Sequence, residues 1–155
     1  MNPYRSAVFA WARHPSFIGF GKRAMRPLDL LTRRTGVAFS SVGTGAPTAY
    51  LTTTGRRTGT IRINPVLAID VPAGLGLISS NWGQNFRPGW HYNLLAEPRC
   101  SLEQRRRSTA YVARPASGAE RDEIWRRALE IYPPWQAYAA RVDRQLDMFL
   151  LEPGP

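Results

Sequence analysis

The clearest structural signal in the sequence is the stretch Thr52-Thr53-Thr54-Gly55-Arg56-Arg57-Thr58-Gly59-Thr60-Ile61-Arg62-Ile63-Asn64-Pro65. Its two ends hold the hydroxyl and β-branched residues typical of strands, and Gly55 and Gly59 bound the turn between them. Glycine adopts the positive φ angles of tight turns at little cost. The stretch therefore predicts a β-hairpin made of the strands 48–54 and 61–69.

The turn of this hairpin carries a high density of positive charge. Arg56 and Arg57 stand between the two glycines, and Arg62 should share one face of the second strand with Asn64 because strand side chains alternate. Arginines beside exposed backbone N–H groups are a typical site for phosphate or carboxylate. Arginines that are merely solvated would give the same pattern, so spacing alone leaves both interpretations open.

The length and composition suit a single domain spanning residues 1–155. The chain is 43% hydrophobic and 21% charged, which are ordinary values for one globular core. Its 21 Lys+Arg against 11 Asp+Glu give a net charge of +10, and Lys22 is the only lysine. This arginine excess predicts an anionic partner. A genome rich in arginine codons would produce the same excess.

Several kinds of partner and site are not expected. The arginines are spread along the whole chain without a nucleic-acid-binding motif, so we expect no nucleic acid partner. The only histidines, His14 and His91, form no cluster with a cysteine, so we expect no metal site. Cys100, the only cysteine, is interpreted as a small buried hydrophobe. Without an apolar run near the ~20 residues of a membrane span, and without a secretion signal, a cytoplasmic location is expected.

The first part of the domain, residues 1–47, is predicted to be helical and basic. Residues 4–34 mix apolar and aromatic groups with arginines, and Pro15 and Pro27 are expected to break them into two or three short helices. A loop of small residues follows at 43–47. Such helices suit peripheral contact with the anionic inner face of a membrane. A lid packed on the domain is the favoured interpretation.

The second part of the domain, residues 48–155, is predicted to be the core. After the hairpin, the predicted elements are a strand at 75–80, a helix at 88–97, a strand pair at 99–105 and 108–113, a helix after a capping box at 117–120, a helix at 135–144 and a strand at 147–152. Antiparallel strands in close succession with inserted helices predict a mainly β fold, a small barrel plus helices.

No protein-based chemistry is evident in the sequence. It contains no catalytic triad, no nucleophile elbow and no Walker or dinucleotide glycine pattern. An enzyme of this sequence would take its chemistry from a bound cofactor. Besides the arginine turn, three groups fit that idea: 78–81 with Gly83 at the end of an apolar strand, 90–93 on a helix, and three aromatic residues at three-residue spacing in 132–138. Each group also has a plain interpretation, as a strand end, a core residue or an aromatic core stripe.

Together, five stretches resemble the deazaflavin-dependent nitroreductase family, whose members use reduced coenzyme F420. They are 51–59 with 62–65, 80–83, 88–98, 132–138 with Asp143-Arg144, and 150–153. They occur in order and with fitting spacing from about residue 48 to the end of the chain. Five stretches in register are much more specific than any one motif.

The resemblance implies a split β-barrel, usually dimeric, which binds the deazaflavin in a groove. The implied cofactor-binding positions are Arg56, Arg57, Thr58 and Arg62 for the phosphate and acidic tail, Ile63, Asn64, Pro65, Val66, Leu67, Ile78, Ser79, Ser80 and Asn81 around the ring, and Gly89, Trp90, His91, Tyr92 and Asn93 closing over it. The implied catalytic positions on the substrate side are Tyr132, Trp135 and Tyr138, where a tyrosine would donate a hydrogen bond or a proton.

The implied activity is hydride transfer from reduced F420 to a small-molecule acceptor, a quinone, an enone or a nitro compound. The phosphate and acidic tail of F420 would give the arginine excess a specific use. One alternative is a carrier that binds F420 without turnover. Another is an oxidoreductase of the same barrel that binds flavin mononucleotide, which also offers a phosphate.

Two positions depart from the family pattern. Asn81 stands where the family often has a lysine, which removes one cation near the phosphate, and Arg87 is a candidate replacement. Trp135 stands where the family has a tyrosine. This change removes a hydroxyl and adds bulk, so it is expected to alter the preference for acceptors.

Overall fold

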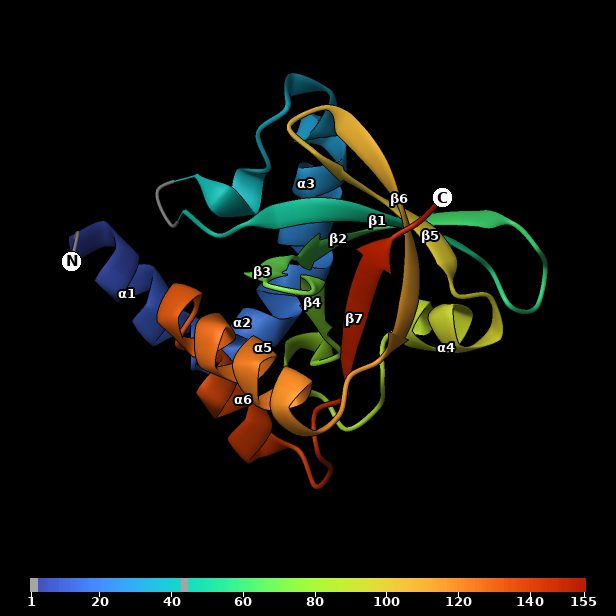
Figure 1. Cartoon of the computed structure of the whole chain (residues 1–155). Helices are drawn as coiled ribbons and strands as arrows, with labels where there is room; N and C mark the ends of the chain where they lie inside the picture. The colour runs from blue at the N-terminus through green and yellow to red at the C-terminus, as the bar shows by residue number, and fades with distance from the viewer. Residues whose placement is uncertain (1–2, 43–44) are drawn as a thin grey trace.

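The computed structural model describes residues 3–42 and 45–155, so part of the loop predicted at 43–47 lies outside the described residues. Seven antiparallel strands form one sheet in the order β2-β1-β5-β6-β7-β4-β3 (Figure 1). The strands are β1 (Thr48–Thr54), β2 (Ile61–Leu67), β3 (Ile69–Val71), β4 (Gly74–Ile78), β5 (Arg99–Gln104), β6 (Arg107–Pro115) and β7 (Met148–Pro153).

The sheet curls back on itself because its two ends are joined by a single residue. β2 and β3 stand at opposite ends of the strand order, and only Ala68 separates them in the chain. The N–H of Ala68 donates to the carbonyl of Pro47 at 3.0 Å, just before β1. The result is a curled half-barrel with helices, which confirms the predicted mainly β, split-barrel fold.

The hairpin predicted from the opening stretch is present. β1 pairs with β2 from Thr48 opposite Leu67 to Thr54 opposite Ile61. The turn closes where the N–H of Gly55 donates to the carbonyl of Thr60 at 2.8 Å, and Gly59 has the positive φ of 68° that favours glycine. The second strand was predicted to run unbroken through 61–69, but it divides at Ala68, where the chain crosses from one end of the sheet to the other.

Helices cover two sides of the half-barrel. The helices α1 (Pro3–Ala12), α2 (Ser16–Phe20), α5 (Gly118–Ile131) and α6 (Trp135–Arg141) gather on one side in Figure 1, and α4 (Gly89–Ala96) lies on another. The first group buries a cluster that includes Phe9, Phe17 and Ile124. A second cluster, with Leu51 and Leu94, fills the space between the strands and α4. Each such buried side chain contributes about 1.5–3 kcal/mol.

The N-terminal helices differ from the prediction at one proline. The predicted break at Pro15 is confirmed, since α1 ends at Ala12 and α2 begins at Ser16. The predicted break at Pro27 is wrong, because α2 continues through a π-helical segment, η1 (Gly21–Met25), directly into α3 (Arg26–Thr32). A proline ring clashes with the carbonyl four residues earlier in a regular α-helix, and the wider π-helical turn makes room for it.

The capping box predicted before α5 is also wrong. Ser117 occupies the N-cap position, but its side chain makes no capping hydrogen bond. Glu120 instead forms an ion pair with Arg114 of β6, with an N–O distance of 2.6 Å. The guanidinium offers the carboxylate a bidentate, charge-assisted partner, which is stronger than a bond to one backbone N–H.

Three shorter helical turns complete the chain, and they are η2 (Arg33–Thr35), η3 (Phe39–Ser41) and η4 (Asn81–Gly83). Cys100 is buried in β5, and burial raises the pKa of its thiol to about 11. Among the described residues, no helix has both the length and the apolar character needed to cross a membrane. The described part of the chain also holds no group of three or more His, Cys, Asp or Glu side chains placed around a common metal position.

Candidate functional site

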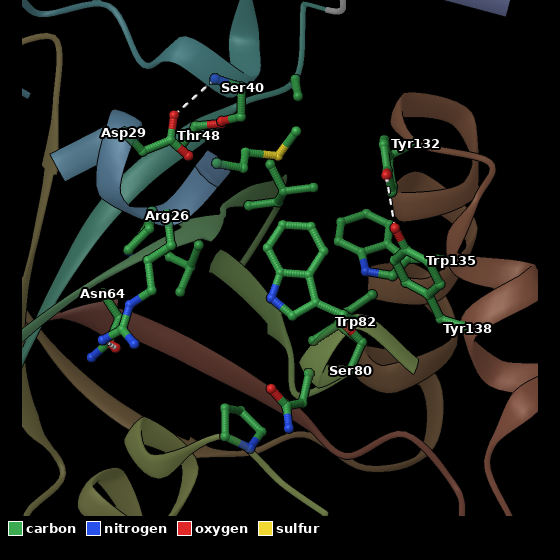
Figure 2. A pocket seen from close by; sticks show the side chains of 18 of the residues that line it. Arg26, Asp29, Ser40, Thr48, Asn64, Ser80, Trp82, Tyr132, Trp135 and Tyr138 are labelled. Atoms are coloured by element: carbon green, nitrogen blue, oxygen red, sulfur yellow. Dashed lines mark hydrogen bonds between the residues drawn. The ribbon is translucent and has the colours of Figure 1, made fainter. Parts of the chain in front are cut away.

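A cavity of about 480 Å³ lies between the edge of the half-barrel and the N-terminal and C-terminal helices (Figure 2). Its lining residues are Val8, Phe17, Met25, Arg26, Asp29, Ser40, Ala46, Thr48, Asn64, Pro65, Val66, Leu67, Ile78, Ser80, Asn81, Trp82, Phe86, Arg87, Pro88, Gly89, Trp90, Tyr132, Trp135 and Tyr138. Most of these side chains are apolar or aromatic, which is typical of a pocket for a small organic molecule.

The predicted site residues divide into two groups. Those that line the cavity are Asn64, Pro65, Val66, Leu67, Ile78, Ser80, Asn81, Gly89, Trp90, Tyr132, Trp135 and Tyr138. Those that lie elsewhere are Arg56, Arg57, Thr58, Arg62, Ile63, Ser79, His91, Tyr92 and Asn93. The first group comes from four separate parts of the chain, and the fold brings them around one space.

The N-terminal helices supply a wall that the sequence analysis did not assign to the site. Val8, Phe17, Met25, Arg26 and Asp29 all line the cavity. Arg26 reaches across to β2, where its guanidinium donates to the Oδ1 atom of Asn64 at 3.0 Å (Figure 2). The predicted lid is therefore one side of the cavity itself.

Trp82 occupies the middle of the cavity in Figure 2, and sequence reasoning gave it no role. Both Asn81 and Trp82 have positive φ angles, 44° and 61°, which are strained for residues other than glycine. The Trp82 ring packs beside Phe17, with centroids 5.8 Å apart. A Cβ atom on Gly21 would lie only 2.9 Å from that ring. Through Trp82, η4 therefore packs the barrel against Phe17 and Gly21 of the N-terminal helices.

Hydrogen bonds and ion pairs from 143–147 hold the loop that carries Trp82. Arg144 donates to the carbonyls of Ser79 and Asn85, both at 2.9 Å. Arg87, the candidate replacement for the missing lysine, lines the cavity and forms an ion pair with Asp147 at 2.5 Å. Its charge is therefore already used within the protein, which does not support its role as a free cation for phosphate.

The aromatic wall holds a pair of hydrogen-bonded tyrosines (Figure 2). The hydroxyls of Tyr132 and Tyr138 are 2.9 Å apart, and the two residues are 7% and 2% exposed. One hydroxyl hydrogen joins the pair, so the other hydrogen is available to a ligand. Burial raises the pKa of Tyr132 to about 12 and also raises that of Tyr138. Both tyrosines therefore keep their protons near neutral pH.

Arg141 lies behind this tyrosine pair. Its guanidinium carbon is 5.7 Å from the centroid of the Tyr138 ring. Its two terminal nitrogens are buried and find no hydrogen-bond partner in the described part of the protein. The positive charge opposes the rise in the pKa of both tyrosines that burial causes.

Residues of α4 hold the arginine turn, residues 55–59, in place. The side chain of Asn93 accepts from the backbone N–H of Arg56 at 3.1 Å and donates to the hydroxyl of Thr53 at 3.0 Å. The Arg56 guanidinium lies 4.7 Å from the centroid of the Tyr92 ring. Gly89 and Trp90, at the start of the same helix, line the cavity. Helix α4 therefore connects the turn with the cavity.

The arginines of the turn have no carboxylate partner in the described part of the protein. No hydrogen bond or ion pair of the Arg56, Arg57 or Arg62 guanidinium groups occurs among residues 3–42 and 45–155. Many other arginines pair with carboxylates: Arg33 with Glu103, Arg87 and Arg144 with Asp147, Arg99 with Glu97, Arg114 with Glu120 and Glu152, and Arg126 and Arg127 with Glu123. Three exposed arginines on one hairpin thus remain available to an anion.

Two buried polar residues of the predicted site do not line the cavity. Ser79 and His91 are 0% and 6% exposed, and neither the Ser79 hydroxyl nor the His91 Nδ1 atom has a partner within the described residues. The His91 ring packs on Phe149, with centroids 5.2 Å apart. Burial lowers the pKa of His91. These residues lie behind the cavity wall.

Most of the chain is similar to one known protein family. The model of the F420H(2)-dependent quinone reductase family matches residues 24–153. The chain belongs to this family. It is therefore an oxidoreductase that uses coenzyme F420, as the resemblance predicted.

Solved structures agree with this membership. An F420-H2 dependent reductase is similar with a TM-score of 0.63 and 30% identity, over 68% of this chain and 94% of that one. A structure described as a domain-swapped dimer has a TM-score of 0.64 and 26% identity, over 81% of this chain and 99% of that one. A heme binding protein from Mycobacterium smegmatis has a TM-score of 0.54 at 16% identity, over 72% of this chain and 48% of that one, and indicates the fold alone.

Proposed function

We propose that this member of the family passes a hydride from reduced F420 to a quinone within the cavity, and that enones and nitro compounds are further acceptors. The observation that carries the proposal is a pairing of two features. The arginine turn and the start of β2 carry three arginines without a carboxylate partner among the described residues, and α4 connects the turn to a cavity with mostly apolar walls. In a cofactor with a planar ring and a polyanionic tail, the tail suits the arginines and the ring suits the apolar cavity.

The residues present fit the cofactor. Arg56, Arg57, Thr58 and Arg62 would hold the phosphate and acidic tail, because charge-assisted hydrogen bonds to anions are the strong ones. The polar edges of Asn64, Ser80 and Asn81, set among apolar walls, would border the ring. Ile63, Ser79, His91, Tyr92 and Asn93 lie outside the cavity lining, and we assign them a supporting role around it.

Bound reduced F420 supplies a hydride from a carbon of its deazaflavin ring, so the protein needs neither a nucleophile nor a metal for the transfer. The chain has three tasks of its own. Its apolar walls exclude water, Trp82 and Trp135 confine the acceptor, and the tyrosine pair presents a hydroxyl hydrogen. A quinone oxygen that gains negative charge would take a proton from this hydroxyl, and the tyrosine would regain a proton from solvent.

Turnover with three acceptors tests this function. Reduced F420 is mixed anaerobically with the protein and menadione, cyclohexenone or a nitroimidazole, and its oxidation is followed by absorbance. We expect oxidation with menadione, because the family acts on quinones and the cavity is large and apolar. Tight binding of F420 without oxidation by any of the three would favour the carrier alternative and reject the proposal.

We also propose that the N-terminal region contacts an anionic membrane surface, on the cytoplasmic side, where lipid-soluble quinones dissolve. Its exposed apolar residues are Tyr4, Trp11, Leu30, Leu31, Val37, Phe39 and Val42. Arg13, Arg23 and Arg34 are exposed in the same region. Apolar side chains with nearby arginines favour binding at the interface of anionic lipids.

Sedimentation with lipid vesicles tests this contact. The protein should sediment with vesicles of anionic lipid more than with neutral ones, and Leu31→Glu should reduce the bound fraction, since Leu31 is 76% exposed. Leu95→Glu on α4, at 55% exposure, is the matched control. Equal sedimentation of the wild type with both kinds of vesicle would reject the contact.

A homodimer is the remaining part of the proposal. A similar structure is described as a domain-swapped dimer, and the family resemblance implied a dimer. Light scattering on the purified protein should give twice the monomer mass. A monomer at concentrations near 100 µM, roughly where weak dimers with a Kd in the micromolar range form, would exclude it.

A further inference from the structure

The end of the cavity beneath the N-terminal helices contains a polar recess. It is formed by Asp29 of α3, Ser40 of η3 and Thr48 at the start of β1, and all three line the cavity. Figure 2 shows them grouped together, across the cavity from the tyrosine pair, with Trp82 between the two groups. The neighbouring lining residues Met25 and Ala46 are apolar.

The recess is held together by hydrogen bonds among its own members. The backbone N–H of Ser40 donates to the Asp29 Oδ1 atom at 2.8 Å, and the hydroxyls of Ser40 and Thr48 are 2.8 Å apart. The backbone carbonyl of Asp29 accepts from the buried hydroxyl of Tyr50 at 2.6 Å. These bonds connect three separate segments, so the positions of the polar groups are fixed before any ligand arrives.

The carboxyl group of Asp29 is an unusual component of an apolar cavity. Asp29 is only 3% exposed, and it forms no ion pair with any described residue. Arg26, one turn earlier on the same helix, is bonded to Asn64 instead. Burial raises the pKa of Asp29, and hydrogen bonds from the backbone and side chain of Ser40 and from the backbone of Phe39 oppose that rise. An ionised carboxyl group has about four acceptor positions, so these bonds leave room for a further donor. A buried carboxyl without a cation is costly unless a hydrogen-bond donor satisfies it.

We propose that this recess binds a hydrogen-bond donor of the acceptor, a hydroxyl or an amine, at the end remote from the tyrosine pair. The inference rests on the proposed function and adds an acceptor class to it: quinones that carry a hydroxylated or amino-bearing substituent. A donor on the ligand would add a hydrogen bond to the recess, and an analogue without the donor could not gain that affinity.

Binding to the cofactor-free protein tests the recess. The ligands are 2,3-dimethyl-1,4-naphthoquinone and its analogue with one methyl replaced by hydroxymethyl, which differ by a single hydroxyl. Quenching of tryptophan fluorescence reports binding, because Trp82 and Trp135 line the cavity. We expect the wild type to bind the hydroxymethyl compound about 10-fold more tightly, a typical effect of one hydrogen bond to a buried polar group.

Two variants remove the recess chemistry in different ways. Thr48→Val replaces a hydroxyl by a methyl group of similar size, and Asp29→Asn keeps the acceptor used by Ser40 while removing the acid. Both should reduce the preference to less than about 3-fold. Ser41→Ala and Asp122→Asn are the matched controls, since both residues lie outside the cavity lining. If Asp29→Asn does not fold, Thr48→Val alone decides.

Equal affinity of the wild type for the two quinones would overturn the inference, and so would an undiminished preference in Thr48→Val. The failure of the proposed function would look different. In that case neither quinone would oxidise reduced F420, whatever their affinities for the cofactor-free protein. Because binding is measured without the cofactor, the two failures are separable.

Discussion

Arg57 and Arg87 illustrate two uses of arginine in one chain. Arg87 lines the cavity, yet its charge is paired with Asp147. Arg57 lies outside the cavity, is exposed on the turn, and has no such pair among the described residues. Arg57 is therefore the better candidate for binding an anion, although Arg87 lies closer to the proposed position of the ring. An arginine that is not already paired with a carboxylate of the protein is the one that can bind an anion of the cofactor.

The turn arginine should contribute measurably to cofactor affinity. Arg57→Ala is expected to weaken F420 binding by about 1.5–3 kcal/mol, the usual worth of a hydrogen bond to a charged group. A fluorescence titration with F420 measures the change. Arg107→Ala, an exposed arginine at the start of β6, is the control. Unchanged affinity in Arg57→Ala would mean that the turn is a solvated hairpin.

The tyrosine pair should contribute to turnover more than to binding. Tyr132→Phe and Tyr138→Phe each break the 2.9 Å bond between the hydroxyls. We expect kcat with menadione to fall about 10²-fold in the variant that removes the proton donor, because general acid catalysis is worth at least that much. Tyr111→Phe on β6 is the control, since it does not line the cavity.

The pH profile gives the same pair a second test. The donor loses its proton only when the pH rises through the folded-state pKa, which burial raises to about 12 for Tyr132 and also raises for Tyr138. The rate should therefore not fall between pH 7 and 9 through loss of this proton. Full activity in both phenylalanine variants would exclude the pair as the donor.

At the level of secondary structure, the π-helical segment η1 joins the two helices that, with α1, supply the N-terminal wall of the cavity. It lets the helix pass Pro27 without a break and brings Gly21 against Trp82. The absence of a side chain at Gly21 is what allows this close approach, since a Cβ there would lie 2.9 Å from the Trp82 ring. The contact joins the N-terminal helices to the strained η4 turn.

Two glycines on this helix should respond to alanine in opposite ways. Gly21→Ala forces Trp82 to move and should destabilise the protein by about 1–3 kcal/mol, as overpacking does. At Gly19 a Cβ would meet nothing within 4 Å, so Gly19→Ala should stabilise it by about 0.5–1 kcal/mol through helix propensity. Urea unfolding measures both. A stabilising Gly21→Ala would contradict the packing described here.

The sequence predicted the elements well where the signals are local. The hairpin 48–67 follows from turn glycines and alternation, and the positions of the helices α4 and α5 follow from proline and apolar spacing. The capping box at Ser117 failed because Arg114, on a different element, competes for Glu120. The helix predicted at 135–144 ends at Arg141, three residues before the predicted end. This end was not predictable from local signals, because Arg144 donates to the carbonyl of Ser79, which is far away in the chain.

In the candidate site, too, local sequence patterns were predictable and contacts between distant segments were not. The family resemblance predicted twelve of the cavity-lining residues, because its motif stretches occur together, in order and with fitting spacing. Trp82, Arg26 and Asp29 were missed, since their place in the cavity depends on how the N-terminal helices pack against the barrel. The assignment of 1–155 to a single domain stays a prediction.

At the level of the whole molecule, buried His91 couples stability to pH. Burial lowers its pKa, and Arg87 and Arg144 add to this effect while Asp147 opposes it. A group with a folded-state pKa below the unfolded value of 6.5 contributes stability above that pH. This stability is lost as the pH falls, because the unfolded chain then binds the proton more readily.

His91→Gln should therefore make the free energy of unfolding less dependent on pH between 6.5 and 5. Urea unfolding of wild type and variant at several pH values in this range measures the slopes. His14→Gln, an exposed residue before α2, is the matched control and should keep the wild-type slope. An unchanged slope in His91→Gln would mean that other groups cause the pH dependence.

The proposed function requires one cofactor to span the arginine turn and the cavity, with its ring beside residues 64–67 and 78–81. A crystal structure of the protein with bound F420 tests it most directly. We expect anionic groups of the cofactor within hydrogen-bond distance of Arg56, Arg57 or Arg62, and the ring facing the side of the cavity that holds Tyr132 and Tyr138. A ring bound outside the cavity, or a tail that avoids all three arginines, would contradict it.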